Sequence, residues 1–183
     1  MKISNGAILH MKGTSMLDDK LVLEDAKLIF RNFSGNQTQF NPEGKRNFCV
    51  LLDTDLANDL KAKGWNVRWL EGRAEGEEPQ AYMQVSVSFD NYPPSIILVT
   101  KKNKTRLASE EVGMLDWAEI QYVDLIIRPY SWVVNNNTGI KAYLKSMYVT
   151  IEEDEFAEKY SEIDSAEPII RAAENAVHED LDV

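Results

Sequence analysis

The sequence predicts an all-β (β-rich) fold, a small barrel or sandwich of five to seven short strands with one inserted helix. Two observations predict it. Between residues 21 and 151 the apolar runs are short and separated by turn-forming residues, and only residues 53–64 carry a helical pattern. A chain of 183 residues is long enough to bury one core. We therefore expect an N-terminal arm over residues 1–20, one folded domain over 21–151 and a tail over 152–183.

The first strands and the helix are predicted before residue 65. Residues 27–33 alternate in polarity and end in the turn cluster at residues 34–36, which indicates a strand. Residues 48–52 are apolar on both faces, as is typical of a strand at the centre of a sheet. The helix that follows is capped by Asp53 or Thr54 and ended by Gly64, and its apolar stripe consists of Leu56, Ala57 and Leu60.

Three more strands are predicted between residues 66 and 100. Residues 66–70 and residues 95–100 are short apolar runs. Residues 81–89 alternate strictly, so we expect one face to point into the core, formed by Met83, Val85, Val87 and Phe89. Residues 71–79 and 91–94 are polar and contain glycine or proline, which predicts loops.

A long hairpin is predicted at the end of the domain. Residues 120–134 form its first strand, residues 135–139 its turn and residues 140–151 its second strand. The turn is rich in asparagine and ends in glycine, and both residue types tolerate the positive φ angles of tight hairpin turns. We expect the exposed faces of the two strands to lie side by side.

The negative charge of the chain is concentrated at its C-terminal end. The formal net charge is -10, and residues 152–183 hold 12 acidic and two basic residues, which also gives -10. Residues 1–151 hold the remaining 18 acidic and 18 basic residues and are neutral. The tail has few large apolar residues, so we expect it to be disordered. The neutral domain is compatible with a nucleic-acid partner, which the net charge alone would argue against.

Several classes of protein are excluded or disfavoured. No run of 18 apolar residues is present, which excludes a membrane-spanning helix, and residues 1–6 lead into no apolar segment of a secretory signal. Cys49 is the single cysteine and cannot form an internal disulfide, so we expect a soluble cytoplasmic protein. His10 and His178 lie at opposite ends of the chain and form no metal site or catalytic dyad. We expect no enzyme, no metal and no cofactor.

Cations and aromatic side chains instead alternate on the predicted strands. Period two places Arg128, Tyr130 and Trp132 on one side of the first hairpin strand, and the second strand offers Lys141, Tyr143 and Lys145. Single-stranded nucleic acid is bound by this combination, because cations follow the phosphates and rings stack on unpaired bases. Each of these rings, and Phe48 as well, could instead be buried in the core rather than stack on a base.

The candidate contacts are spread over most of the domain. Four cations occur within residues 101–106, and the early strands and residue 82 add further rings and cations. The full predicted set is Arg31, Phe33, Lys45, Arg46, Tyr82, Lys101, Lys102, Lys104, Arg106, Arg128, Tyr130, Trp132, Lys141, Tyr143 and Lys145.

The C-terminal half resembles a known family. Residues 122–132, the asparagine-rich turn and residues 139–144 resemble the end of the OB barrel in phage single-stranded DNA-binding proteins, and residues 27–33 and 44–48 are similar to its early part. The resemblance implies an OB-type barrel that binds single-stranded DNA and carries an acidic tail. The chain differs from the family pattern at Ala118-Glu119, where a Gly-Ser pair is common, and at its end, Val183, where an aromatic residue is usual.

We therefore expect a protein that coats and protects single-stranded DNA during phage replication or recombination, largely independent of sequence, in the cytoplasm of the host cell. The tail is hypothesised to compete with DNA and to recruit replication or recombination proteins through Glu179, Asp180, Leu181, Asp182 and Val183. A homodimer is compatible with the sequence. The alternatives are a virion structural protein and an acidic protein-binding inhibitor that mimics DNA.

Overall fold

The computed structural model describes residues 14–17, 20–72 and 76–153. The chain divides into two units, Met1–Glu152 and Glu153–Val183, and the first contains every element described below. The segment expected as an N-terminal arm is described only in part. The acidic tail from residue 154 on, with the five residues expected to bind partners, lies outside the described residues.

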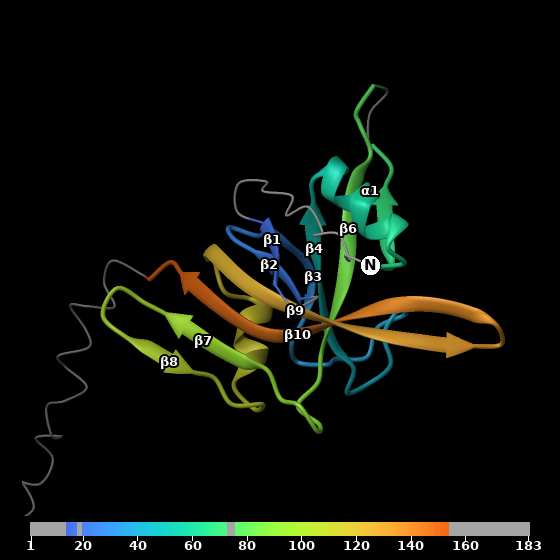
Figure 1. Cartoon of the computed structure of the whole chain (residues 1–183). Helices are drawn as coiled ribbons and strands as arrows, with labels where there is room; N and C mark the ends of the chain where they lie inside the picture. The colour runs from blue at the N-terminus through green and yellow to red at the C-terminus, as the bar shows by residue number, and fades with distance from the viewer. Residues whose placement is uncertain (1–13, 18–19, 73–75, 154–183) are drawn as a thin grey trace, which may run out of the picture. The chain divides into compact units, whose positions relative to one another are not determined.

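The described residues form ten strands and one α-helix, which confirms the predicted β-rich class (Figure 1). The helix α1 spans Thr54–Ala62, and a 3-10 turn, η1, spans Val112–Asp116. The number of strands exceeds the expectation because β1, β2 and β8 were not predicted, and these have only three or four residues, too few for a clear periodic signal. The strands are β1 (Thr14–Leu17), β2 (Lys20–Leu23), β3 (Leu28–Asn32), β4 (Arg46–Leu52), β5 (Val67–Leu70), β6 (Gln80–Val87), β7 (Ser95–Val99), β8 (Lys104–Arg106), β9 (Ile120–Val134) and β10 (Asn137–Ile151).

The strand β10 joins most of the sheet. The order of strands is β1-β2-β9-β10-β6-β4-β3, with β5 added on β6, β7 on β10 and β8 on β7. β10 pairs antiparallel with β9 over nearly its whole length, and parallel with β6 and then with β7. The path ends at β1 and β3, which do not pair with each other in the described part of the chain. The result is an OB-like β-fold.

A register shift keeps the core face of β10 continuous. Its pairing with β9 skips Lys145. Ala142 and Leu144 before this residue are buried, and so are Met147 and Val149 after it. Strict alternation would have turned Met147 outward. The one extra residue lets Met147 and Val149, in the second half of β10, point into the core.

The hairpin between β9 and β10 closes more tightly than predicted. Only Asn135 and Asn136 lie between the strands, and their φ angles are 48° and 65°. A two-residue hairpin turn with positive φ at both central residues matches the twist of the strands. Pairing resumes at Asn137, so residues 137–139, which were predicted as part of the turn, belong to β10.

The core is formed by the inner faces of the long strands together with α1 and η1. Phe33 and Phe48 are both 0% exposed and stack with ring centroids 5.2 Å apart. The predicted helix stripe is buried as expected, and Gly64 after the helix has φ +93°. On β6, Met83, Val85 and Val87 are buried as predicted, whereas Phe89 lies beyond the strand and is only partly buried.

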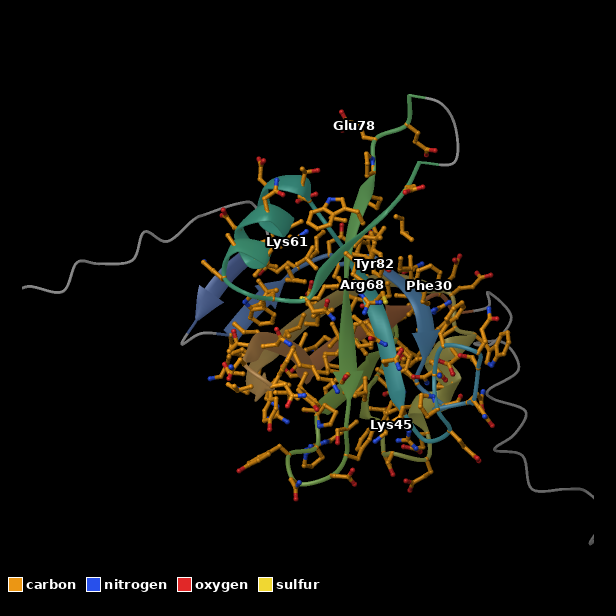
Figure 2. The ribbon with its side chains drawn as sticks, turned by 90° about the vertical axis from the view of Figure 1, so that its right-hand side faces the viewer. Phe30, Lys45, Lys61, Arg68, Glu78 and Tyr82 are labelled. Carbon is orange, nitrogen blue, oxygen red and sulfur yellow. The ribbon has the colours of Figure 1, made fainter. Side chains whose placement is uncertain are left out.

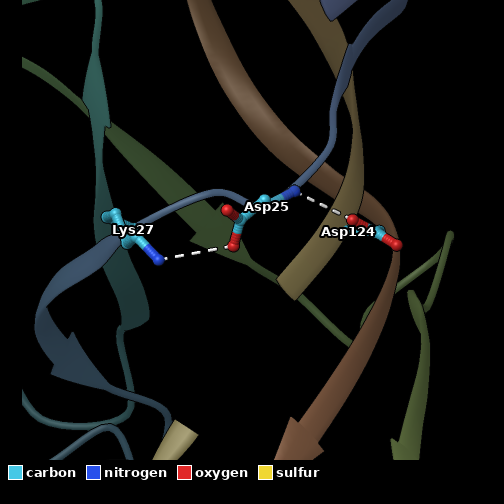
Figure 3. A network of polar contacts seen from close by, with 3 residues as sticks. All are labelled: Asp25, Lys27 and Asp124. Atoms are coloured by element: carbon cyan, nitrogen blue, oxygen red, sulfur yellow. Dashed lines mark hydrogen bonds and ion pairs between the residues drawn. The ribbon is translucent and has the colours of Figure 1, made fainter. Parts of the chain in front are cut away.

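The connection between β2 and β3 is fixed to β9 (Figure 3). The backbone N–H of Asp25 donates to the carboxylate of Asp124 at 2.9 Å, and the N–H of Ala26 donates to the carbonyl of Val123 at 2.8 Å. Lys27 forms an ion pair with Asp25 at 3.3 Å. These contacts hold the start of β3 against the long hairpin.

A single carboxylate ties the loop after β3 to η1. The N–H groups of Phe33 and Ser34 donate to Asp116 at 2.6 and 3.0 Å, and the Ser34 hydroxyl donates to it at 2.6 Å. Arg31 reinforces this connection, because its guanidinium donates to the carbonyls of Leu115 and Ala118 at 2.9 and 2.8 Å. The loop between β3 and β4 therefore starts from a fixed point.

The substitution Asp116→Ala is expected to lower the free energy of unfolding by about 2 kcal/mol, because three donors lose a charged acceptor. Urea denaturation followed by circular dichroism measures the change. Asp59→Ala on the exposed side of α1 is the matched control and should leave the stability within about 0.5 kcal/mol of the parent. Equal effects of the two substitutions would show that the network contributes nothing.

Candidate nucleic-acid interface

The outer face of β4 and β6 is hollowed by two adjoining depressions of about 700 and 400 Å³. Both are lined by Phe40, Asn41, Asn47 and Gln84, so they form one continuous groove, which we call the β4–β6 groove. The loop between β3 and β4 borders one side, and β10 contributes residues at the far end. In the sequence these segments are far apart, from Phe30 to Tyr143, and the sheet brings them together.

One end of the groove is an aromatic corner with a cation beside it. The Phe30 ring meets the Tyr82 ring edge-on, with centroids 6.3 Å apart, and Phe30 is 62% exposed. Arg68 of β5 is the register partner of Tyr82. Figure 2 shows Phe30, Tyr82 and Arg68 close together at this end of the sheet, with Lys45 further along.

Phe30 reaches this position through an irregularity of β3. Its φ angle is +50°, a left-handed conformation that is costly for a residue with a bulky side chain. The pairing of β3 with β4 shifts register between Ile29 and Asn32. Such bulges redirect side chains, and a strained residue held by its surroundings is often a functional one. Here the shift exposes the Phe30 ring and leaves Arg31 to bind η1.

The other end of the groove has tyrosine rings surrounded by cations. Lys141 lies 5.0 Å and Arg128 5.3 Å from the Tyr143 ring centroid, and Tyr130 meets Tyr143 edge-on at 5.9 Å. Arg128 also lies 5.1 Å from the ring of Tyr92, in the loop after β6. Cations over ring faces are held by the ring quadrupole, so the rings and charges are positioned before any ligand binds.

The strand register explains why these residues meet. Tyr143 pairs with Arg128 on β9 and with Ser86 on β6, and Lys141 pairs with Tyr130. Paired residues point to the same face of a sheet. The two hairpin strands therefore combine their rings and cations on one face, as the sequence pattern predicts.

The same face continues toward the tip of the hairpin. Trp132 pairs with Gly139, and a Cβ at Gly139 would lie 2.7 Å from the Trp132 ring, so the ring rests directly on the glycine. Ile140 is fixed to the end of α1, because its N–H donates to the carbonyl of Gly64 at 2.9 Å. Beyond this anchor the hairpin projects from the body of the sheet (Figure 1).

Two predicted contacts have structural roles instead. Phe33 is fully buried against Phe48 and has no ring face available to a base, so its prediction as a binding residue is wrong. Arg31 is engaged with the backbone of η1. The positions of both side chains follow from the register shift in β3, which a prediction based on regular alternation does not include.

The basic cluster at residues 101–106 does not line the groove. It was predicted to be a loop, but Lys104–Arg106 forms β8, which pairs with β7. Lys104 is aligned through Val99 with Thr150 of β10, seven residues from Tyr143. At about 3.3 Å per residue this is roughly 23 Å along the strand. The structure therefore divides the predicted contacts between two surfaces.

Four residues in the groove or beside its hairpin end were not predicted from the sequence. Phe30 and Phe40 are exposed rings, Arg68 is an exposed cation, and Tyr92 lies against Arg128. For Arg68 a signal was present, because it alternates with apolar residues on its strand as Arg128 does. No periodic signal marks Phe40, which lies in a loop.

Within the described residues, no group of three or more histidine, cysteine, aspartate or glutamate side chains could hold a metal ion. The searched part of the chain also contains no helix long and apolar enough to cross a membrane.

Cys49 lies in the first depression but is nearly buried. Burial raises the pKa of its thiol to about 11, and the nearby positive charge of Arg68 reduces the rise. Because the thiolate is disfavoured in the folded chain, the associated stability is complete below the ordinary pKa of about 9.0 and is lost as the pH rises through about 11.

We expect Cys49 to react slowly with iodoacetamide at about pH 8, because only the thiolate is nucleophilic. The rate should climb as the pH approaches the raised pKa of the thiol. Mass spectrometry of timed samples measures it, and the urea-unfolded chain is the control, which should react at the rate of a free cysteine. Equally fast reaction of the folded chain at about pH 8 would contradict the buried position.

A family model described as "Putative phage ssDNA-binding domain" matches residues 12–182 of the chain. Among solved structures, the single-stranded DNA-binding protein from bacteriophage Enc34 in complex with ssDNA is similar with a TM-score of 0.53 and 11% identity, over 79% of this chain and 94% of that chain. A second structure of the single-stranded DNA-binding protein from bacteriophage Enc34 has a TM-score of 0.52 and 12% identity, over 85% of this chain and 96% of that chain. At this identity the likeness is one of fold. No curated protein matches.

Proposed function

The chain belongs to the phage single-stranded DNA-binding domain family and binds single-stranded DNA, and on this premise we propose that it coats and protects such DNA during phage replication or recombination. The β4–β6 groove is the proposed binding surface. The observation that carries this assignment is the group around Tyr143, where a ring at the groove end lies within about 5 Å of two cations, Lys141 and Arg128. Rings stack on unpaired bases and cations neutralise phosphates.

The position of the groove in the fold supports the proposal. OB folds bind oligonucleotides on the face of two central strands, between the loop that joins early strands and the loop of the final hairpin. The β4–β6 groove is bordered by the loop after β3 and by the β9–β10 hairpin. A protein of similar fold from bacteriophage Enc34 is described in complex with ssDNA, which supports single-stranded DNA as the ligand.

The strand is proposed to run along the groove from one aromatic group to the other. Phe30, Tyr82 and Arg68 receive one end, and Lys45, exposed on the loop before β4, lines the second depression together with Lys141 and Tyr143. The hairpin residues Arg128, Tyr130, Trp132, Lys141 and Tyr143 receive the other end. Stacking and phosphate contacts are available to any base, so binding is expected to be largely independent of sequence.

The acidic tail is proposed to compete with DNA for the cations of the domain and to recruit replication or recombination proteins in the host cytoplasm. The support is its charge of -10 against a neutral residue range 1–151. A tethered polyanion acts at a high effective concentration. A virion structural role and a DNA-mimic role are less well supported, because the groove combines rings with cations and a mimic requires an acidic face.

We expect Tyr143→Ala to weaken binding of oligo-dT by about 1–3 kcal/mol, because one stacking platform is lost. Fluorescence anisotropy of a labelled oligonucleotide measures the affinity, and quenching of the protein's own tryptophan fluorescence reports stacking near Trp132. Binding should weaken as salt is raised, since phosphate contacts release counterions. Duplex DNA should bind less tightly than oligo-dT.

Two variants serve as controls for this measurement. Tyr143→Phe keeps a ring and should bind within about twofold of the parent. Lys63→Ser removes an exposed cation at the end of α1 that lines neither depression, and should also have little effect. If Tyr143→Ala binds as tightly as Tyr143→Phe, the groove is not the binding surface.

Deleting residues 152–183 is expected to tighten the binding of oligo-dT at low salt, because a competing polyanion is removed. The gain should shrink at high salt, where charge is screened. Titration of the full chain and the deletion variant at two salt concentrations measures it. An unchanged affinity at low salt would refute competition by the tail.

A further inference from the structure

A second exposed surface with rings and cations lies at the opposite end of β10 from the hairpin tip. It is formed by β9, β10, β7 and β8, which lie side by side there (Figure 1). We call it the β7–β8 face and define it by Tyr122, Tyr148, Ile97, Lys104 and Arg106. None of these residues lines the β4–β6 groove.

The register places these side chains on one face in two rows. In the first row Tyr148 pairs with Ile97, and Ile97 pairs with Arg106. In the second row Tyr122 pairs with Thr150, which pairs with Val99 and through it with Lys104. Paired residues share a face, and the residues flanking Tyr148 in β10 are both buried, so the rows point outward.

The exposure of these rings has no structural explanation within the described residues. Tyr148 is 50% and Tyr122 60% exposed, and Lys104 and Arg106 are exposed at the edge of the sheet. The one carboxylate in the two rows, Asp124, already accepts the backbone N–H of Asp25. The face therefore combines two ring platforms with two cations, as the groove does.

The β7–β8 face is continuous with the groove along the outer side of β10. Lys141 and Tyr143 belong to the groove, Lys145 follows at the register shift and is exposed, and Tyr148 begins the second face. Tyr143 and Tyr148 are five residues apart, which is about 17 Å along a strand. That span corresponds to roughly five stacked nucleotides at about 3.4 Å each.

We propose that the β7–β8 face is a second, distinct contact site for single-stranded DNA, reached only by strands long enough to extend past Lys145. The proposal rests on the proposed use of the groove. Tyr148 and Tyr122 stack on bases, and Lys104 and Arg106 neutralise phosphates. DNA is favoured as the occupant because the same pairing of rings with cations continues from the groove without interruption.

The test compares the binding of a short oligo-dT of about 6 nucleotides with that of a longer one of about 16. A single OB fold typically covers roughly 4 to 16 nucleotides. Tyr148→Ala in the full chain is expected to weaken binding of the longer strand about tenfold and to leave the shorter strand within about twofold. Lys104→Ser combined with Arg106→Ser should reduce the salt slope of log K by about 1.4 for the longer strand alone, because two phosphate contacts are lost.

Matched variants separate this proposal from the proposed function. Tyr148→Phe keeps a ring and should restore binding of the longer strand, and Lys63→Ser should change neither strand. If Tyr143→Ala weakens both strands while Tyr148→Ala weakens neither, the second site is refuted and the groove stands. If Tyr148→Ala weakens both strands equally, the face is not a separate extension and the proposal is also refuted.

A protein occupant is the remaining outcome. A synthetic peptide of residues 152–164 carries seven acidic residues and one lysine. If it binds the parent protein but not the Lys104→Ser, Arg106→Ser variant, and the longer oligo-dT binds both equally, the face binds acidic peptide rather than DNA, which overturns the proposal. If both peptide and oligo-dT discriminate between the two proteins, DNA remains an occupant and the proposal holds.

Discussion

The arrangement of the domain depends on the pairing of β10 with three other strands. It is antiparallel to β9 and parallel first to β6 and then to β7, so it connects the groove-forming strands to the β7–β8 hairpin. Its inner residues fill the core, and its outer residues supply Lys141, Tyr143 and Tyr148. One extra residue, Lys145, keeps both halves in the correct orientation. A strand without that insertion would present either a polar core or an apolar surface.

The sequence was sufficient wherever a long periodic signal coincided with a regular element. The alternation of residues 81–89, the helix stripe and the paired faces of the hairpin all follow from period two or 3.6. The prediction from sequence failed at β3, where Phe33 was expected to contact DNA. A register shift in this strand leaves Phe30 exposed and Phe33 buried. The prediction also failed at β8, because three exposed residues give no pattern. Bulges and short edge strands are decided by tertiary pairing rather than by local sequence.

The grouping of the site residues could be predicted only in part for a related reason. Charge and ring content identify candidates along the chain, but a groove exists only when distant strands are placed in register. Arg68, Tyr82 and Phe30 come from three strands and meet through β6. Conversely, Lys104 and Arg106 resemble the groove cations in sequence, but they align with β10 at Thr150 and Tyr148, five to seven residues from Tyr143. Similar residues therefore serve two surfaces.

The separation of charge between residues 1–151 and the tail also affects how the protein behaves in solution. The tail supplies the whole net charge of -10, and residues 1–151 carry equal numbers of acidic and basic residues. Proteins near zero net charge repel one another weakly and associate or precipitate more readily. The domain also exposes rings such as Phe40 and Trp117, 87% and 86% accessible, that favour such association. From its charge alone, we expect the tail to reduce association between copies of the chain when no DNA is bound.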